Sequence, residues 1–175
     1  MNQNKKWEKC VTFHGHDSGG LTIGYKASLL AIELLELKYS PDEQVVCVSE
    51  NDACGVDSIQ VLLGCSVGKG NLPFHLTGKQ AFSIYNHLTG KSVRLMLRKR
   101  PEGLSREESL TYYQGLEPRD MFEVVPTRIE VPEQARLFNS YICEICGERT
   151  RSNWIRIMGE KRFVLIASNL TIAMT

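Results

Sequence analysis

The sequence predicts an α+β fold in which a mixed or antiparallel sheet packs against helices. Apolar residues at helical spacing run from Leu21 to Leu37, and a β-branched run of strand length follows from Gln44 to Ser49. Between Gln80 and Arg98, two apolar segments flank a turn at Thr89–Lys91, which is the pattern of a β-hairpin. Because helical and strand patterns do not alternate regularly, the sequence favours α+β over a doubly wound parallel sheet.

The other elements are predicted from local signals. Ser105, with Glu108 three residues later, has the pattern of a capping box that begins a helix. Pro126 interrupts the last apolar run and indicates a strand at the edge of the sheet. In chain order, we expect a short strand or the end of an N-terminal helix at 9–13, a break at Gly19–Gly20, helices at 21–37 and 56–63, strands at 44–49, 72–76, 81–85 and 93–97, helices at 106–115 and 118–122, and a strand at 122–131.

Composition and charge argue against several function classes. The 175 residues are 42% hydrophobic and 23% charged, which is typical of a globular protein. The net charge is +1 and the isoelectric point is about 7.6, so there is no electrostatic case for nucleic-acid binding. No apolar run reaches the ~18 residues of a membrane span, and the N-terminus lacks the apolar region of a signal peptide. We therefore expect a cytoplasmic protein with no membrane or nucleic-acid partner.

One cysteine-containing segment, residues 50–71, brings several candidate ligands together. Cysteines in a reducing compartment are more often metal ligands or nucleophiles than disulfides. Cys54 can be a thiolate ligand, a nucleophile or a small buried apolar residue, whereas Cys65 ends an apolar helix and is expected to be structural. Asp52 and Asp57 are candidates for binding a metal or orienting a histidine through its second nitrogen, and Asp52 alternatively caps the next helix.

A second segment supplies two of the four histidines. His14 and His16 are separated by Gly15, and two more glycines follow at Gly19–Gly20. These glycines let the backbone bend sharply, so that both imidazole rings can reach one ion. Imidazole suits zinc, nickel, copper or iron, although a pair of solvated loop histidines is the alternative. We expect a metal or catalytic role, and we expect this segment to meet residues 50–71 in the fold.

The turn at Gly68–Asn71 resembles half of a phosphate-binding loop. It lacks the full Gly-x-x-x-x-Gly-Lys-Ser/Thr pattern, so nucleotide binding is not favoured. Lys69 and Asn71 are instead candidates for closing over a smaller anionic ligand or cofactor.

The C-terminal segment, residues 132–175, contains half of a zinc ribbon and follows a core domain at residues 1–131. Cys143 and Cys146 are separated by two residues and followed by glycine, which is the arrangement of a zinc knuckle. A ribbon needs a second pair of ligands about 15–20 residues further on. No cysteine or histidine follows Cys146, so the ribbon is incomplete.

Four segments form long and specific motifs, namely Phe13–His16, Gly20–Lys26, Glu50–Cys65 and Gly68–Leu72. Together they resemble the family of the E subunit of formylmethanofuran dehydrogenase, and the resemblance extends from about Trp7 to Val131. Many members of that family have a zinc-ribbon tail that is similar to the DksA/TraR type. The Cys143–Cys146 segment looks like the first half of such a tail.

The resemblance implies an α+β core, a homodimer, and a site for zinc or another divalent transition metal built from His14, His16 and Cys54. It also implies a partner, a molybdenum or tungsten oxidoreductase of one-carbon metabolism. The family commonly has a cysteine two residues after the second histidine, where this sequence has Ser18. The loss of that soft ligand is expected to weaken metal binding or redox activity.

Three functions are consistent with these features. The first, which rests on the resemblance, is a metal-binding protein accessory to such an oxidoreductase. The second is a stand-alone enzyme that uses a metal-bound water or the Cys54 thiol, with Asp52 or Asp57 as the proton acceptor. The third is a zinc-ribbon regulator that contacts polymerase or nucleic acid, and the near-neutral charge argues against it.

We predict that the residues from Val164 onward are a frameshifted ending, because this stretch is apolar and uncharged. Valine codons begin with GT and alanine codons with GC. If the reading frame moves back by one base and each of these two codons gains a T in front, the codons at 164 and 167 become TGT and TGC, which both encode cysteine. The result would be Cys-x2-Cys-x17-Cys-x2-Cys, a complete ribbon spacing. Sequencing the gene is expected to show that one T restored after Phe163 puts both cysteines in frame. A T run with no missing base, and no in-phase cysteines downstream, would contradict the prediction.

Overall fold

The computed structural model describes residues 2–130 and 138–164. The chain divides into two compact units, Met1–Ala135 and Arg136–Thr175, close to the predicted boundary after residue 131. No helix within the described ranges is long and apolar enough to cross a lipid bilayer.

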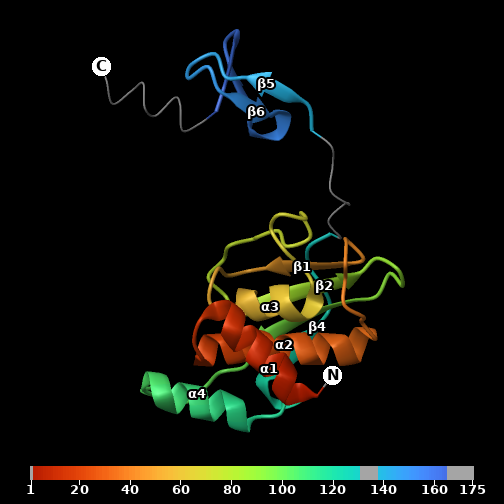
Figure 1. Cartoon of the computed structure of the whole chain (residues 1–175), viewed down its shortest axis with the longest axis vertical. Helices are drawn as coiled ribbons and strands as arrows, with labels where there is room; N and C mark the ends of the chain where they lie inside the picture. The colour runs from red at the N-terminus through yellow and green to blue at the C-terminus, as the bar shows by residue number, and fades with distance from the viewer. Residues whose placement is uncertain (1, 131–137, 165–175) are drawn as a thin grey trace. The chain divides into compact units, whose positions relative to one another are not determined.

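The first unit contains five helices and four strands among its described residues (Figure 1). The helices are α1 (Gln3–His14), α2 (Gly19–Leu35), α3 (Gly55–Leu63), α4 (Arg106–Gly115) and α5 (Pro118–Met121). The strands are β1 (Val45–Ser49), β2 (Ala81–Asn86), β3 (Ser92–Leu97) and β4 (Phe122–Val125). The predicted capping box is confirmed at the start of α4, where Ser105 and Glu108 exchange side-chain and backbone hydrogen bonds.

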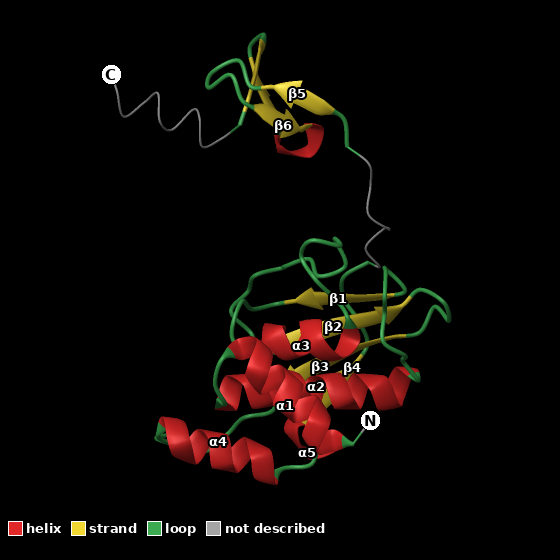
Figure 2. Cartoon of the chain, in the orientation of Figure 1, coloured by secondary structure: helices red, strands yellow, loops and turns green. Residues whose placement is uncertain are grey.

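The four strands form one antiparallel sheet in the order β1-β2-β3-β4, which confirms the α+β fold class. The helices lie on one face of this sheet (Figure 2). Alternate strand residues point into the main core between the sheet and the helices, as expected for a pleated sheet. These residues are Val45, Cys47, Phe82, Ile84, Val93 and Leu95.

Helix α2 runs through the centre of the unit and is buried along most of its length. It begins earlier than predicted because Ser18 caps it, accepting a hydrogen bond at Oγ from the Leu21 amide at 3.0 Å. The predicted break at Gly19–Gly20 is therefore wrong, since both glycines lie in the first turn of the helix. The helix ends at Glu36, which has a left-handed backbone with φ of 52°.

Helices α2 and α3 touch backbone to backbone at a pair of glycines. A Cβ atom added to Gly24 would lie 1.9 Å from the carbonyl oxygen of Gly55, so no side chain fits there. Ser58 strengthens this contact by donating a hydrogen bond to the Leu21 carbonyl at 2.9 Å. The close approach places the first turn of α3 directly beside the first turns of α2.

A buried ion pair joins β3 to the residue that follows β1. Arg94 on β3 contacts the Glu50 carboxylate at 2.6 Å through Nε and at 3.0 Å through Nη2. Both side chains are almost fully buried. The hydrogen bonds from Arg94 hold the pKa of Glu50 below its usual value, so the pair stays ionised.

Two predicted strands differ from the structure. Residues 72–76 form only an isolated bridge between Phe74 and Ser49, because Pro73 has no N–H with which to continue the ladder. Strand β4 ends at Val125, before Pro126, and is shorter than the predicted 122–131. Residues 9–13 lie inside α1, so the helical alternative at that position is confirmed.

The described residues of the second unit form two small hairpins. Strands β5 (Ser140–Ile142) and β6 (Arg149–Arg151) flank the cysteine knuckle, and a 3-10 turn, η1 (Ser152–Trp154), follows. Strands β7 (Arg156–Met158) and β8 (Lys161–Phe163) form the second hairpin. Phe163 is buried against Cys143, so the second hairpin packs on the knuckle.

Replacing Gly24 with Ala is expected to destabilise the first unit by about 3 kcal/mol or more, because the added methyl group meets backbone that cannot rotate away. The midpoint of urea unfolding measures the loss. Gly115→Ala is the matched control, since a Cβ there meets nothing within 4 Å. Equal midpoints for the two variants would show that the α2–α3 contact is looser than described.

Candidate functional site

His14 makes the contact between the histidine segment and residues 50–71. This residue ends α1, and Gly15 closes the helix with φ of 93° and a hydrogen bond from its backbone N–H to the Val11 carbonyl. His14 Nδ1 lies 2.6 Å from Oδ2 of Asp57 on α3, which makes this the closest polar contact between the segments. Because a carboxylate accepts hydrogen bonds, we assign the ring proton of His14 to Nδ1. Asp57 therefore orients the histidine through one nitrogen, as the sequence suggested.

The other nitrogen of His14 is buried and has no hydrogen-bond partner among the described residues. The side chain is only 13% exposed, so water has little access to it. With the proton on Nδ1, Nε2 presents a lone pair. An imidazole held by a carboxylate on one side with a free lone pair on the other is the usual arrangement of a metal ligand.

His16 lies beside His14, with ring centroids 4.6 Å apart. Its Nε2 is 2.9 Å from Nη2 of Arg106 on α4. A guanidinium can only donate, so His16 accepts with the same lone pair that a metal would use. Within residues 2–130 and 138–164, no three His, Cys, Asp or Glu side chains are grouped closely enough to enclose an ion. A metal at this site would have to displace Arg106 from His16.

Cys54 immediately precedes α3, one helical turn before Asp57. It is half-buried and lines a cavity together with Ser18 and Gly20. A Cβ added to Gly20 would lie 3.6 Å from the Cys54 sulfur and 4.0 Å from the Ser18 hydroxyl. Ser18, at the position where the family pattern has cysteine, therefore lies near the Cys54 thiol. The sequence did not reveal that Ser18 also caps α2.

Asp52 does not take part in this arrangement. It is exposed, and the predicted cap is absent because no side chain caps α3 at Cys54. Asn51 instead accepts a hydrogen bond from the Ala53 amide at 3.2 Å, which shapes the loop before the helix. Of the two aspartates considered, the structure brings only Asp57 to His14.

Lys69 and Asn71 contact backbone carbonyls of the chain segment before β1. Lys69 Nζ donates to the Ser40 carbonyl at 3.0 Å. Asn71 is buried, and its Nδ2 donates to the carbonyls of Asp42 and Val45 at 3.0 and 2.9 Å. Both side chains hold the chain segment before β1 in place, and their role as anion or cofactor contacts stays a prediction.

The remaining core cysteines are structural. Cys10, Cys47 and Cys65 are fully buried, and burial raises the pKa of each thiol, that of Cys65 to about 12. These thiols stay protonated at neutral pH and are poor nucleophiles and poor ligands. The structural role expected for Cys65 agrees with this burial.

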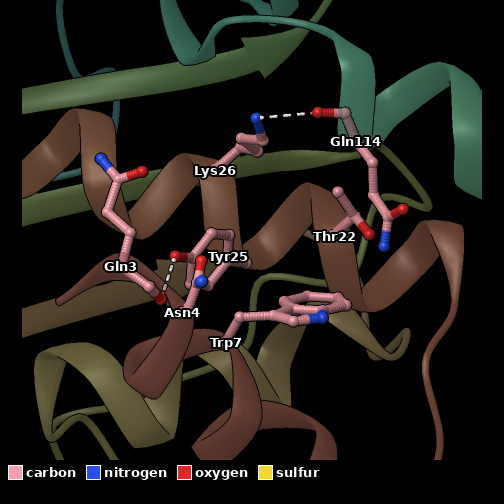
Figure 3. A pocket seen from close by; sticks show the side chains of 7 residues that line it. All are labelled: Gln3, Asn4, Trp7, Thr22, Tyr25, Lys26 and Gln114. Atoms are coloured by element: carbon pink, nitrogen blue, oxygen red, sulfur yellow. Dashed lines mark hydrogen bonds between the residues drawn. The ribbon is translucent and has the colours of Figure 1, made fainter.

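A separate small cavity of about 200 Å³ lies between α1, α2 and α4 (Figure 3). Trp7 meets Tyr25 edge to face in its wall, with ring centroids 5.2 Å apart. Two of its polar side chains already have partners, since Tyr25 donates to the Gln3 carbonyl and Lys26 to the Gln114 carbonyl (Figure 3). These hydrogen bonds link the helices around the cavity, so it is a weaker candidate site than the cavity beside Cys54.

The knuckle in the second unit holds one thiol among backbone amides. Cys143 is buried, and amide N–H groups, that of Cys146 first and also those of Val164 and Ile145, lower its pKa to about 7. Val164, the predicted position of a third cysteine, thus lies beside Cys143. Ala167, the predicted position of the fourth, lies outside the described residues.

Known proteins share the motifs and the fold of the first unit. The family model described as FmdE, molybdenum formylmethanofuran dehydrogenase operon, matches residues 13–125. The chain belongs to the FmdE family. A crystal structure of a tungsten formylmethanofuran dehydrogenase FmdE-like protein from Syntrophus aciditrophicus has the same fold, with a TM-score of 0.69 and 24% identity over 87% of this chain and 88% of that one.

A curated relative in Archaeoglobus fulgidus is described as a probable S-adenosyl-L-methionine-binding protein. It is 29% identical over 168 residues, and the match covers 78% of this FmdE-family chain. The match spans only 46% of the relative's own length.

We predict that Cys143 ionises near pH 7 once any metal is removed, because three backbone amides stabilise its thiolate. The test is ultraviolet absorbance of thiolate in chelator-treated protein, titrated between pH 5 and 10. The low-pH step should vanish in Cys143→Ser and persist in Cys146→Ser, where the amide of residue 146 remains. Thiolate that forms only near pH 9 would contradict the described amide contacts.

Proposed function

We propose that this FmdE-family protein binds a divalent transition metal, zinc being the first candidate, through His14, His16 and Cys54. In this proposal it serves as an accessory to a molybdenum or tungsten oxidoreductase of one-carbon metabolism. The observation that most supports metal binding is the buried, unpartnered Nε2 of His14, whose ring is held by Asp57. A buried polar atom without a partner is costly, and a metal would satisfy it.

The donor set fits such an ion. Imidazole nitrogen and thiolate sulfur are the ligands that zinc prefers, and three protein ligands leave one position open. His16 becomes available when Arg106 releases its Nε2. Ser18 stands where the family pattern has a second thiol, so we expect weaker binding than a site with two thiolates would give.

The partner and the assembly are also proposals. The family description names a molybdenum formylmethanofuran dehydrogenase operon, and the similar solved structure is named for the tungsten enzyme. An accessory role beside such an enzyme follows by analogy, as do a homodimer and a cytoplasmic location.

A second candidate function uses Cys54 as the reactive group of a thiol enzyme. The supporting observation is that Cys54 is the one half-buried cysteine among the described residues of the core and lines a cavity. A zinc-ribbon regulator has less support, because the described tail has one cysteine pair and the chain has a near-neutral net charge.

The test is metal content of the purified protein by mass spectrometry. Wild type is expected to hold about one equivalent per chain, and His14→Ala and Cys54→Ser are expected to lose it. Asp57→Asn should weaken binding about 10–100-fold while leaving the ligands in place, because the ring of His14 is no longer held by a carboxylate.

Two control variants separate this centre from other sites. His75→Ala changes an exposed histidine outside the centre and should keep the metal. Cys143→Ser should also keep it if the ribbon half is not the site. Metal retained in His14→Ala and Cys54→Ser but lost in Cys143→Ser would overturn the proposal. Metal retained in Cys54→Ser alone would leave the thiol free for the second candidate function.

A further inference from the structure

Two adjoining cavities open beside Cys54, and their walls are basic. One, of about 360 Å³, is lined by Cys54, Arg100 and Arg106 among others. The other, of about 420 Å³, is lined by Arg98, Lys99 and again Arg100. Both include Gly20 and Ser109, so they form one continuous cleft of the size that small ligands occupy. We refer to it as the basic cleft.

The positive charge of the basic cleft is not neutralised by the described residues. No aspartate or glutamate among them lines either cavity. None of its four cationic side chains lies within 4.0 Å of a carboxylate in the part of the chain that the structure describes. Four cations in one cleft are notable in a chain with a net charge of only +1, and they favour an anionic ligand.

Backbone N–H groups add to the positive electrostatic potential of the basic cleft. The first turn of α2 lines the cleft through Gly19 and Gly20, and the start of α4 lines it through Ser105 and Arg106. Helix N-termini present amide N–H groups and a partial positive charge. Neither glycine has a side chain to block access to these amides.

The far part of the cleft has a different character. Ile23, Leu97 and Tyr113 form an apolar wall there. Gln80 lines the same part, and its buried Oε1 has no partner among the described residues. A ligand that fills the cleft would thus have an anionic end, an apolar body and a group able to donate a hydrogen bond to Gln80.

We propose that the basic cleft binds a small organic oxyanion, a phosphate ester or a carboxylate, with its charged group between Arg100, Arg106 and the first turn of α2. Arginine pairs with the two oxygens of such groups through parallel hydrogen bonds. The bound anion would lie against Cys54 and cover its thiol. This inference does not require a metal at His14, because none of the cationic side chains of the basic cleft is one of the proposed metal ligands.

Calorimetric titration of the chelator-treated full-length chain with phenyl phosphate, benzoate and inorganic phosphate tests the proposal. Arg100→Gln and Arg106→Gln are each expected to weaken binding of the preferred probe about tenfold or more, since each removes a charged hydrogen-bond donor. Arg128→Gln, which removes the same charge from an exposed position outside the cleft, should change affinity less than twofold. Phenyl phosphate binding more tightly than benzoate identifies a phosphate ester, and the reverse order identifies a carboxylate.

Protection of Cys54 gives a second readout that needs no variant in the cleft. The bound probe should slow alkylation of Cys54 by iodoacetamide, followed by peptide mass spectrometry, and leave the exposed Cys146 unaffected. The proposal is overturned if none of the probes binds, if both arginine variants bind as the control does, or if Cys54 reacts at the same rate with and without the probe. Because metal is absent throughout, these outcomes are independent of the metal test.

Discussion

The backbone contact between Gly24 and Gly55 is the constraint on which the candidate site depends. It brings the starts of α2 and α3 within van der Waals distance, which only two residues without side chains allow. Cys54 and Asp57 lie at the start of α3, and Ser18 and Gly20 at the start of α2. The relative positions of Cys54, Asp57 and Ser18 are therefore set by how closely these two helices approach.

A series of side-chain contacts connects the proposed metal centre with the basic cleft. Asp57 holds His14, His14 lies beside His16, and His16 accepts from Arg106, which lines the basic cleft. Arg106 thus belongs to both the proposed metal centre and the proposed anion site. An anion that attracts Arg106 would free His16 for a metal, and linkage requires the metal to favour the anion by the same factor.

The described residues of the second unit form two short hairpins and include one pair of cysteines. Two hairpins bring Val164 beside Cys143, where a third ligand of the family's ribbon would be expected. Burial of Phe163 against Cys143 supplies an apolar contact. Such a small unit has a limited core, and ribbons of this size usually depend on their metal for stability.

The sequence by itself determined the fold class, the helix and strand types of most elements and the family. These properties follow from local periodicity, from capping signals such as Ser105 with Glu108, and from motifs that are contiguous in the chain. The tertiary structure alone decided which candidates converge. Lys69 and Asn71 became backbone supports, and Arg100 and Arg106 became the walls of a cleft. No local pattern marks these roles, because they depend on contacts between residues that are far apart in the chain and on space left between helices.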